Sequence, residues 1–139
     1  AQRLAANVRK IESDNRNVPL GGNNAGSSAT GKYQFLRDSV EPAINRTLRR
    51  VEPQDKNIFD SIRENKDTSK LNDEAQQLLF FGDIFEKTGS DKHLVPYFLG
   101  DEQAGKNVYL YQHHTLSSKV PEYNQETIDR TNKLWNSPE

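Results

Sequence analysis

Residues 72–86, with the sequence NDEAQQLLFFGDIFE, carry the richest apolar stripe in the chain. Its apolar side chains recur every three or four residues, which is the spacing of one face of an α-helix, and they are Ala75, Leu78, Leu79, Phe81, Ile84 and Phe85. Ser69 or Asn72 can cap the start of this helix, and Gly89 can end it. The segment therefore predicts a buried central helix against which other elements pack.

Weaker helical stripes lie on the N-terminal side of this segment. The first helix is expected near residues 1–13, with apolar positions Leu4, Val8 and Ile11. A second helix is expected to start at Asp38 or Ser39 with Pro42 in its first turn, and its stripe is Val40, Ile44, Leu48 and Val51. A short helix after Pro53 is expected to contain Ile58, Phe59 and Ile62.

The C-terminal side continues the helical pattern. Short helices are expected at residues 92–99 and 101–112, followed by a last helix capped by Asn124. The last helix carries Thr127, Ile128, Thr131, Leu134 and Trp135. We expect Trp135 to pin this helix to the core rather than to stack on a sugar.

The bulk composition bounds the class of protein. The chain has 139 residues, a net charge of −1 and no cysteine, and its mean hydropathy is −0.95. A single domain over residues 1–139 is the usual outcome for this length. Balanced charge gives no general attraction to nucleic acid, and no apolar run is long enough for a membrane span. Strand signals are weak. We therefore expect a mainly α fold with little or no sheet, in an excised domain or a processed chain.

Residues 14–31 interrupt the helical pattern with Asn, Gly, Ser and Pro. A loop of this length inside a small domain is usually functional or mobile. At most a small hairpin is expected within residues 15–34.

Glu12 stands directly before this loop, on the edge of the first apolar stripe. In the last turn of a helix the backbone dipole disfavours a carboxylate, and partial burial does the same. Both effects raise a carboxyl pKa, and a protonated carboxylic acid is what cleavage of a glycosidic bond requires. The alternative interpretation is an ordinary helix-end glutamate with its carboxylate in solvent.

Two further segments favour the catalytic interpretation. Ile11-Glu12-Ser13, the polar loop and then Ser28-Ala29-Thr30-Gly31-Lys32-Tyr33-Gln34-Phe35 together resemble the signature of lytic transglycosylases and goose-type lysozymes. The resemblance implies a lysozyme-like fold with a substrate cleft and Glu12 as the catalytic acid/base. It also implies that Ser13 orients the substrate or Glu12, and that Gln34 lines the saccharide cleft with Tyr33 and Phe35 beside it.

The segment Tyr97-Phe98-Leu99-Gly100-Asp101-Glu102-Gln103-Ala104-Gly105 resembles a stretch of the phage virion-associated members of this family. The resemblance covers the first 36 residues well and residues 94–112 loosely. The Ala-Tyr-Asn-x-Gly segment with which many transglycosylases contact the sugar is absent from this sequence. Tyr97, Tyr109 or Tyr111 is therefore expected to supply the hydroxyl that holds Glu12.

The reaction type follows from the number of acids. Ordinary glycosidases use two carboxylates, whereas Asp14 is the only other acid between Glu12 and Asp38. A single-acid site favours a lytic transglycosylase that cleaves the MurNAc-β-1,4-GlcNAc bond and leaves 1,6-anhydro ends. A hydrolysing muramidase stays open because a distant acid can fold into the cleft: Asp83, Glu86, Asp101 or Glu102. A non-catalytic virion or secretion component, or a sugar-binding module, is the third alternative.

Partners and location follow from the same resemblance. The partner is expected to be peptidoglycan glycan strands, within a phage virion, tail or secretion assembly, and the location virion-associated, periplasmic or extracellular. No cofactor and no metal are expected. Adjacent histidines on a helix point about 100° apart, so His113 and His114 are interpreted as a polar helix end.

Overall fold

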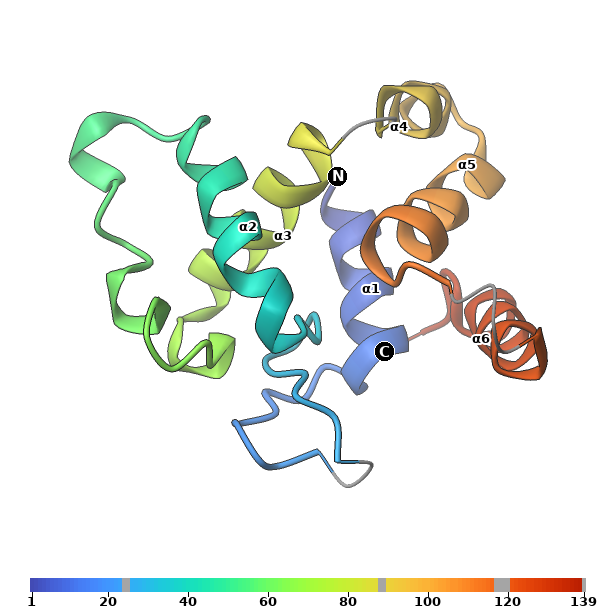
Figure 1. The fold of residues 1–139 in the computed structure, drawn as a ribbon. Coiled ribbons are helices and arrows are strands. Elements are labelled where there is room, and N and C mark those ends of the chain that lie inside the picture. Colours follow the sequence, from blue (N-terminus) through green and yellow to red (C-terminus); the bar gives the residue numbers. More distant parts are fainter. Residues whose placement is uncertain (24–25, 88–89, 117–120, 139) are drawn as a thin grey trace.

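The fold is organised around a pair of packed helices, α2 and α3, and a central helix α1 (Figure 1). The computed structural model describes residues 1–139 except 24–25, 88–89, 117–120 and 139. The α-helices are α1 (Gln2–Ser13), α2 (Arg37–Leu48), α3 (Asp73–Glu86), α4 (Ser90–Phe98), α5 (Glu102–Asn107) and α6 (Pro121–Leu134). Short 3-10 turns are η1 (Pro53–Asp55), η2 (Asp60–Ile62) and η3 (Thr68–Lys70), and η4 (Val108–His113) is a π-helix. The prediction of a mainly helical single domain is confirmed.

Helix α3 forms where the apolar stripe predicts it. The Asn72 side chain accepts a hydrogen bond from the Ala75 N–H, which satisfies one of the free donors at the helix start. Its most deeply buried apolar side chains are Leu79, Phe80 and Ile84, whereas the predicted stripe members Leu78, Phe81 and Phe85 are only partly buried. The helix is therefore rotated slightly from the face that the sequence predicts.

Helices α2 and α3 approach closely because Gly82 has no side chain. A Cβ built on Gly82 lies 2.7 Å from the Thr47 Cα, a separation that real Cβ atoms do not adopt. The Thr47 hydroxyl sits in this crossing and donates to the Ala43 carbonyl, with the Leu79 carbonyl 3.3 Å away. The two helix backbones are thus in direct contact at Gly82, and the buried Thr47 hydroxyl has a hydrogen-bond partner there.

Helix α1 lies between the α2–α3 pair and the C-terminal helices (Figure 1). Its predicted stripe of Leu4, Val8 and Ile11 is buried. The chain then turns at Asp14, which has a left-handed φ of 56° and donates its N–H back to the Lys10 carbonyl. This ending leaves Glu12 in the last turn of α1, as predicted.

The loop after α1 is anchored by buried polar side chains rather than by a hairpin. Only isolated antiparallel bridges join Val18 to Gly31 and Thr30 to Phe35 within the described part of the loop. Gln76, which is 2 % exposed, accepts from the Lys32 N–H and donates to the Leu71 carbonyl. The Gln76 side chain therefore ties the loop to α3.

Several predicted helix boundaries are wrong. Helix α2 begins at Arg37, so Pro42 lies inside it and neither Asp38 nor Ser39 caps it. The cap comes from the loop instead, because the Ser28 hydroxyl accepts from the Arg37 N–H. Residues 53–62 form 3-10 turns instead of one helix.

The C-terminal half also departs from the predicted boundaries. The expected helix over 101–112 is α5 followed by η4, with the Asp101 side chain as its cap. Helix α6 starts at Pro121, three residues before the predicted cap Asn124, since proline suits a first helical position. Gly89, the expected end of the central helix, lies outside the described residues, and α3 ends at Glu86. The Trp135 indole donates to Glu102 at 2.9 Å and pins the chain end to α5, as expected.

Within the described residues, no helix combines the length and apolar character needed to cross a bilayer.

The α2–α3 crossing yields a stability prediction. Gly82→Ala is expected to lower the free energy of unfolding, because the clash with the Thr47 backbone costs about 1–3 kcal/mol and exceeds the helix-propensity gain of up to about 1 kcal/mol. The exposed Glu74→Ala on the same helix is the control and should change stability by no more than about 0.5 kcal/mol. Urea unfolding of the three proteins measures both effects. A Gly82→Ala protein at least as stable as the wild type would contradict the close crossing.

Candidate active site

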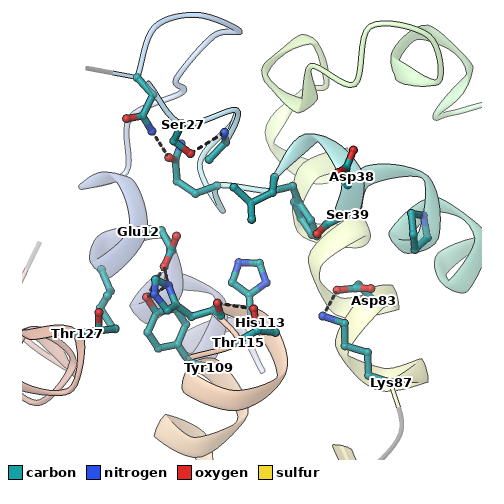
Figure 2. Close-up of a pocket in the computed structure, with 18 of the residues that line it drawn as sticks. Glu12, Ser27, Asp38, Ser39, Asp83, Lys87, Tyr109, His113, Thr115 and Thr127 are labelled. Carbon is teal, nitrogen blue, oxygen red and sulfur yellow. Dashed lines mark hydrogen bonds and ion pairs between the residues drawn. The ribbon is translucent and has the colours of Figure 1, made fainter. Parts of the chain in front are cut away.

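A cleft of about 810 Å³ opens where the end of α1, the loop before α2 and the C-terminal helices meet. Figure 2 shows Glu12 on one side of this cleft and the Asp83–Lys87 pair on the other, with His113 between them. Of the residues predicted to bind substrate, Gln34, Phe35 and Tyr109 line the cleft. The cleft therefore brings together residues from the first and the last thirds of the chain.

Glu12 points into the cleft, and its side chain is only 11 % exposed. The Tyr109 hydroxyl donates a hydrogen bond to Glu12 Oε1, and the His114 Nδ1 lies 2.9 Å from the same oxygen. Among the described residues, no protein group pairs with Oε2. One carboxyl oxygen is thus held by the protein, and the other is left for a ligand.

The contact continues from His114 to the surface. The His114 Nε2 lies 3.0 Å from the Tyr123 hydroxyl, and the two rings stack with centroids 5.8 Å apart. Tyr123 is 46 % exposed on α6. Glu12, His114 and Tyr123 therefore form a chain of contacts that runs from the cleft floor to solvent.

The π-helix η4 is what places Tyr109 and His114 on the same carboxyl oxygen. The His114 N–H donates to the Tyr109 carbonyl five residues back, at 2.8 Å. In a regular α-helix residues five apart diverge around the axis, because each residue turns by about 100°. The wider turn brings both side chains to Glu12. π-turns of this kind are frequent at functional sites.

The balance of effects on Glu12 differs from the sequence expectation. Burial raises its pKa, as predicted. The hydrogen bond from His114, the charges that the two histidines carry when protonated, and the Tyr109 hydroxyl lower the pKa further than burial raises it. The net Glu12 pKa lies below its ordinary value. The prediction of a raised pKa was wrong because the partners on Oε1 come from η4 and the residue that follows it, far from Glu12 in the sequence.

Two neighbours of Glu12, Tyr109 and His113, are kept in their neutral forms. Burial and the nearby Glu12 charge raise the pKa of Tyr109 far above its ordinary value, so its hydroxyl stays a donor. Burial lowers the pKa of His113, and its Nε2 lies 2.6 Å from the Tyr33 carbonyl oxygen. The buried His113 Nδ1 has no hydrogen-bond partner in the described structure. An unpaired lone pair on a neutral ring fits this arrangement.

Gln34 and Phe35 form the loop wall of the cleft. Gln34 has a left-handed φ of 55°, and its side-chain amide donates to the Gly31 carbonyl and accepts from Asn23. Phe35 is 4 % exposed and meets the His113 ring edge to face. Both residues line the cleft, as expected, and their contact with a saccharide stays a prediction.

Four predicted substrate contacts lie away from the cleft. Tyr33 is buried against Phe80, with ring centroids 4.8 Å apart, and its hydroxyl accepts from Arg9. Ser13 is buried and donates to the Lys32 carbonyl at 2.7 Å, so it ties the end of α1 to the loop. Tyr97 and Tyr111 do not line the cleft. Tyr97 is buried with its ring against Gly105, and Tyr111 is 53 % exposed. Of the three candidate tyrosines, Tyr109 holds Glu12.

The opposite wall of the cleft carries a buried charge cluster. Asp83 is 2 % exposed, and its two oxygens pair with Arg46 at 2.8 Å and Lys87 at 2.9 Å. Asp83 is thus one of the distant acids that the sequence left open, and it does line the cleft. Two further carboxylates, Asp38 and Glu126, are exposed at the rim.

Sequence reasoning missed His113, His114 and Tyr123. The adjacent histidines were interpreted as a polar helix end, whereas they lie against Tyr33 and Glu12. The sequence does contain a signal for this site, because Tyr109 and His114 are five residues apart. This spacing brings two side chains together only in a π-turn, which the sequence analysis did not consider. No group of three or more acidic or histidine side chains within the described ranges is arranged to hold a metal ion.

Comparisons with known proteins were made at three levels. No protein-family profile, no curated protein and no solved structure matches the chain.

Proposed function

We propose that this protein is a peptidoglycan lytic transglycosylase that uses Glu12 as its single acid/base. The observation that carries the proposal is the state of the Glu12 carboxyl in the cleft: Oε1 is held by Tyr109 and His114, and Oε2 has no hydrogen-bond partner in the described part of the chain. A carboxyl held in one orientation with one free oxygen suits proton transfer to a bound substrate.

The cleft supports a saccharide as the ligand. Its volume of about 810 Å³ lies in the upper range of small-molecule sites. Hydroxyl, amide and charged side chains line it together with apolar ones such as Ile11, Phe35 and Leu36. Sugar rings present the same mixture of hydroxyl groups and apolar faces. The C-terminal end of α1 and the loop that carries Gln34 meet at this cleft, which is the arrangement that the resemblance to lytic transglycosylases implies.

In the proposed reaction Glu12 acts first as an acid, which gives up a proton, and then as a base, which takes one. Protonated Glu12 donates from Oε2 to the glycosidic oxygen as the bond between C1 and this oxygen breaks, assisted by the N-acetyl group of the muramyl residue. The Glu12 carboxylate then takes a proton from the muramyl C6 hydroxyl as the C6 oxygen bonds to C1. The first proton stays on the leaving hydroxyl, the proton from the C6 hydroxyl restores the acid form of Glu12, and a 1,6-anhydro end forms.

Hydrolysis by a muramidase is the second candidate, and Asp83 is the observation that favours it. A hydrolase needs a second carboxylate to activate water or to form a covalent intermediate. Asp83 lines the same cleft, but Arg46 and Lys87 each engage one of its oxygens. Both oxygens of Asp83 are therefore already engaged, and neither is free to activate water or to attack C1. This pairing supports the transglycosylase.

The biological setting belongs to the same proposal. Peptidoglycan glycan strands are the proposed substrate, and a phage virion, a tail or a secretion apparatus is the proposed assembly. Action on the bacterial cell wall places the protein in a virion, the periplasm or the outside of the cell. A non-catalytic wall-binding component is the alternative, and a Glu12 variant separates it from an enzyme.

Replacement of the acid is the first test. Glu12→Gln keeps the size of the side chain but removes the transferable proton, so turnover of purified peptidoglycan should fall by at least about 10²-fold. Glu64→Gln is the matched control, because this exposed carboxylate is not among the residues that line the cleft. It should stay within about threefold of the wild type. Equal clearing of walls by wild type and Glu12→Gln would contradict the assignment, and EDTA should leave the rate unchanged.

Product analysis distinguishes the two reactions. Digestion in water enriched in ¹⁸O should give muropeptides without ¹⁸O and lighter by one water than reducing-end products, because the attacking oxygen is the substrate's own C6 hydroxyl. Mass spectrometry of the released fragments measures both properties. Incorporation of one ¹⁸O at the new end would instead establish hydrolysis.

The lowered Glu12 pKa predicts a pH dependence. The acid form is required and is scarce in the free protein at neutral pH, so kcat/KM should rise as the pH is lowered from about 8 to 5. Above the Glu12 pKa it should fall about tenfold per pH unit. Bound sugar excludes water from Oε2 and so raises the Glu12 pKa in the complex. The fall of kcat with rising pH should therefore occur at a higher pH than the fall of kcat/KM. Flat profiles from pH 5 to 9 would exclude Glu12 as the acid.

A further inference from the structure

A network of side chains behind Glu12 determines where its proton can sit. We propose that His114 and Tyr123 are positioning residues that place the acid proton of Glu12 on Oε2, the oxygen that faces the cleft. This inference rests on the proposed function for its catalytic consequence, whereas the proton placement itself can be measured without turnover.

The first step concerns Oε1. The Tyr109 hydroxyl donates to this oxygen, and the His114 Nδ1 lies 2.9 Å from it. When both groups carry a hydrogen, Oε1 accepts two hydrogen bonds. A third hydrogen on Oε1 would then face two donors, so a proton added to Glu12 goes to Oε2. The network leaves the acid hydrogen on the side of the substrate.

The second step concerns the tautomer of His114. A neutral imidazole carries one hydrogen, either on Nδ1 or on Nε2, and the partner of the other nitrogen selects the tautomer. The Tyr123 hydroxyl lies 3.0 Å from Nε2. A phenol is a better hydrogen-bond donor than acceptor, because its oxygen shares electron density with the ring. Tyr123 therefore donates to Nε2 and leaves the hydrogen on Nδ1.

The opposite tautomer would disable the site. With the hydrogen on Nε2, the Nδ1 lone pair would face Glu12 Oε1. Nδ1 is then satisfied by a protonated Oε1 that donates to it, or by the Tyr109 hydroxyl 3.4 Å away, which would leave Oε1 to do so. In the first case the acid hydrogen points away from the cleft, and in the second Oε1 loses its hydrogen bond from Tyr109. Tyr123 thus acts on Glu12 through His114, as the third member of a hydrolytic triad orients a base through its tautomer.

The geometry of the ring supports this role. His114 lies between Tyr109 and Tyr123, with ring centroids 5.7 and 5.8 Å away. The two aromatic neighbours come from η4 and α6, and Glu12 comes from α1. The His114 side chain is 18 % exposed. A ring enclosed in this way keeps Nδ1 on Glu12 and Nε2 on Tyr123.

Nuclear magnetic resonance measures the tautomer directly. The ¹⁵N shifts of the His114 ring in ¹⁵N-labelled protein, above the pH at which it loses its charge, should report the hydrogen on Nδ1. The chain has three histidines, so substitution of His93 and His113 assigns the signals. In the Glu12→Gln protein, whose neutral amide stands in for the protonated acid, Tyr123→Phe should shift His114 towards the Nε2–H form. An Nε2–H tautomer in the wild type, or an unchanged tautomer when Tyr123→Phe is added to Glu12→Gln, would overturn the proposal.

Kinetics then test the consequence. The amide nitrogen of an asparagine side chain can occupy the place of Nδ1, whereas that of glutamine reaches the place of Nε2. His114→Asn should keep kcat within about tenfold of the wild type, and His114→Gln should lose at least about 10²-fold with little change in KM. Tyr123→Phe should lower kcat severalfold alone and not at all in the His114→Asn protein. The exposed Tyr111→Phe is the control.

The outcomes separate the two levels of the proposal. Equal losses in His114→Asn and His114→Gln would overturn the positioning role, because the imidazole itself would then be needed. Wall clearing that is independent of Glu12 would overturn the proposed function. The ring shifts would still decide the proton placement in that case, since they require no substrate.

Discussion

Two contacts that converge on one carboxyl oxygen hold the site together. Glu12 Oε1 accepts from Tyr109 and lies 2.9 Å from the His114 Nδ1, which joins the end of α1 to η4. The contact between His114 and Tyr123 extends this junction to α6. Without these partners a largely buried carboxylate would carry an uncompensated desolvation cost. The same partners explain why the Glu12 pKa lies below its ordinary value although the side chain is buried.

The rest of the fold fixes the two walls of the cleft, namely the loop that carries Gln34 and the helix that carries Asp83. Gln76 fixes the loop that carries Gln34, because it accepts from the Lys32 N–H and donates to the Leu71 carbonyl. The close crossing of α2 and α3 at Gly82 supports the wall that carries Asp83. These contacts fix the walls of the cleft, and Glu12 Oε2, which has no hydrogen-bond partner among the described residues, stays available to a ligand.

Local patterns predicted the helices well and the partners of Glu12 poorly. The stripe of Leu4, Val8 and Ile11 was enough to place Glu12 in the last turn of a buried helix, and Asn72 was recognisable as a cap. Periodicity assumes a regular α-helix, so it could not predict the π-turn that brings His114 next to Tyr109. Tyr33 and Ser13 were wrongly predicted to contact substrate because each stands next to a cleft residue in the sequence. The side chains of both residues instead point into the core.

A crystal structure with a bound chitooligosaccharide tests the central claim most directly. The account predicts a sugar chain across the cleft between Gln34 and Tyr123, with a glycosidic oxygen within hydrogen-bond distance of Glu12 Oε2. It also predicts that Oε1 keeps its contacts with Tyr109 and His114. A sugar bound elsewhere on the molecule, or a Glu12 side chain turned so that Oε1 meets the ligand, would contradict the account.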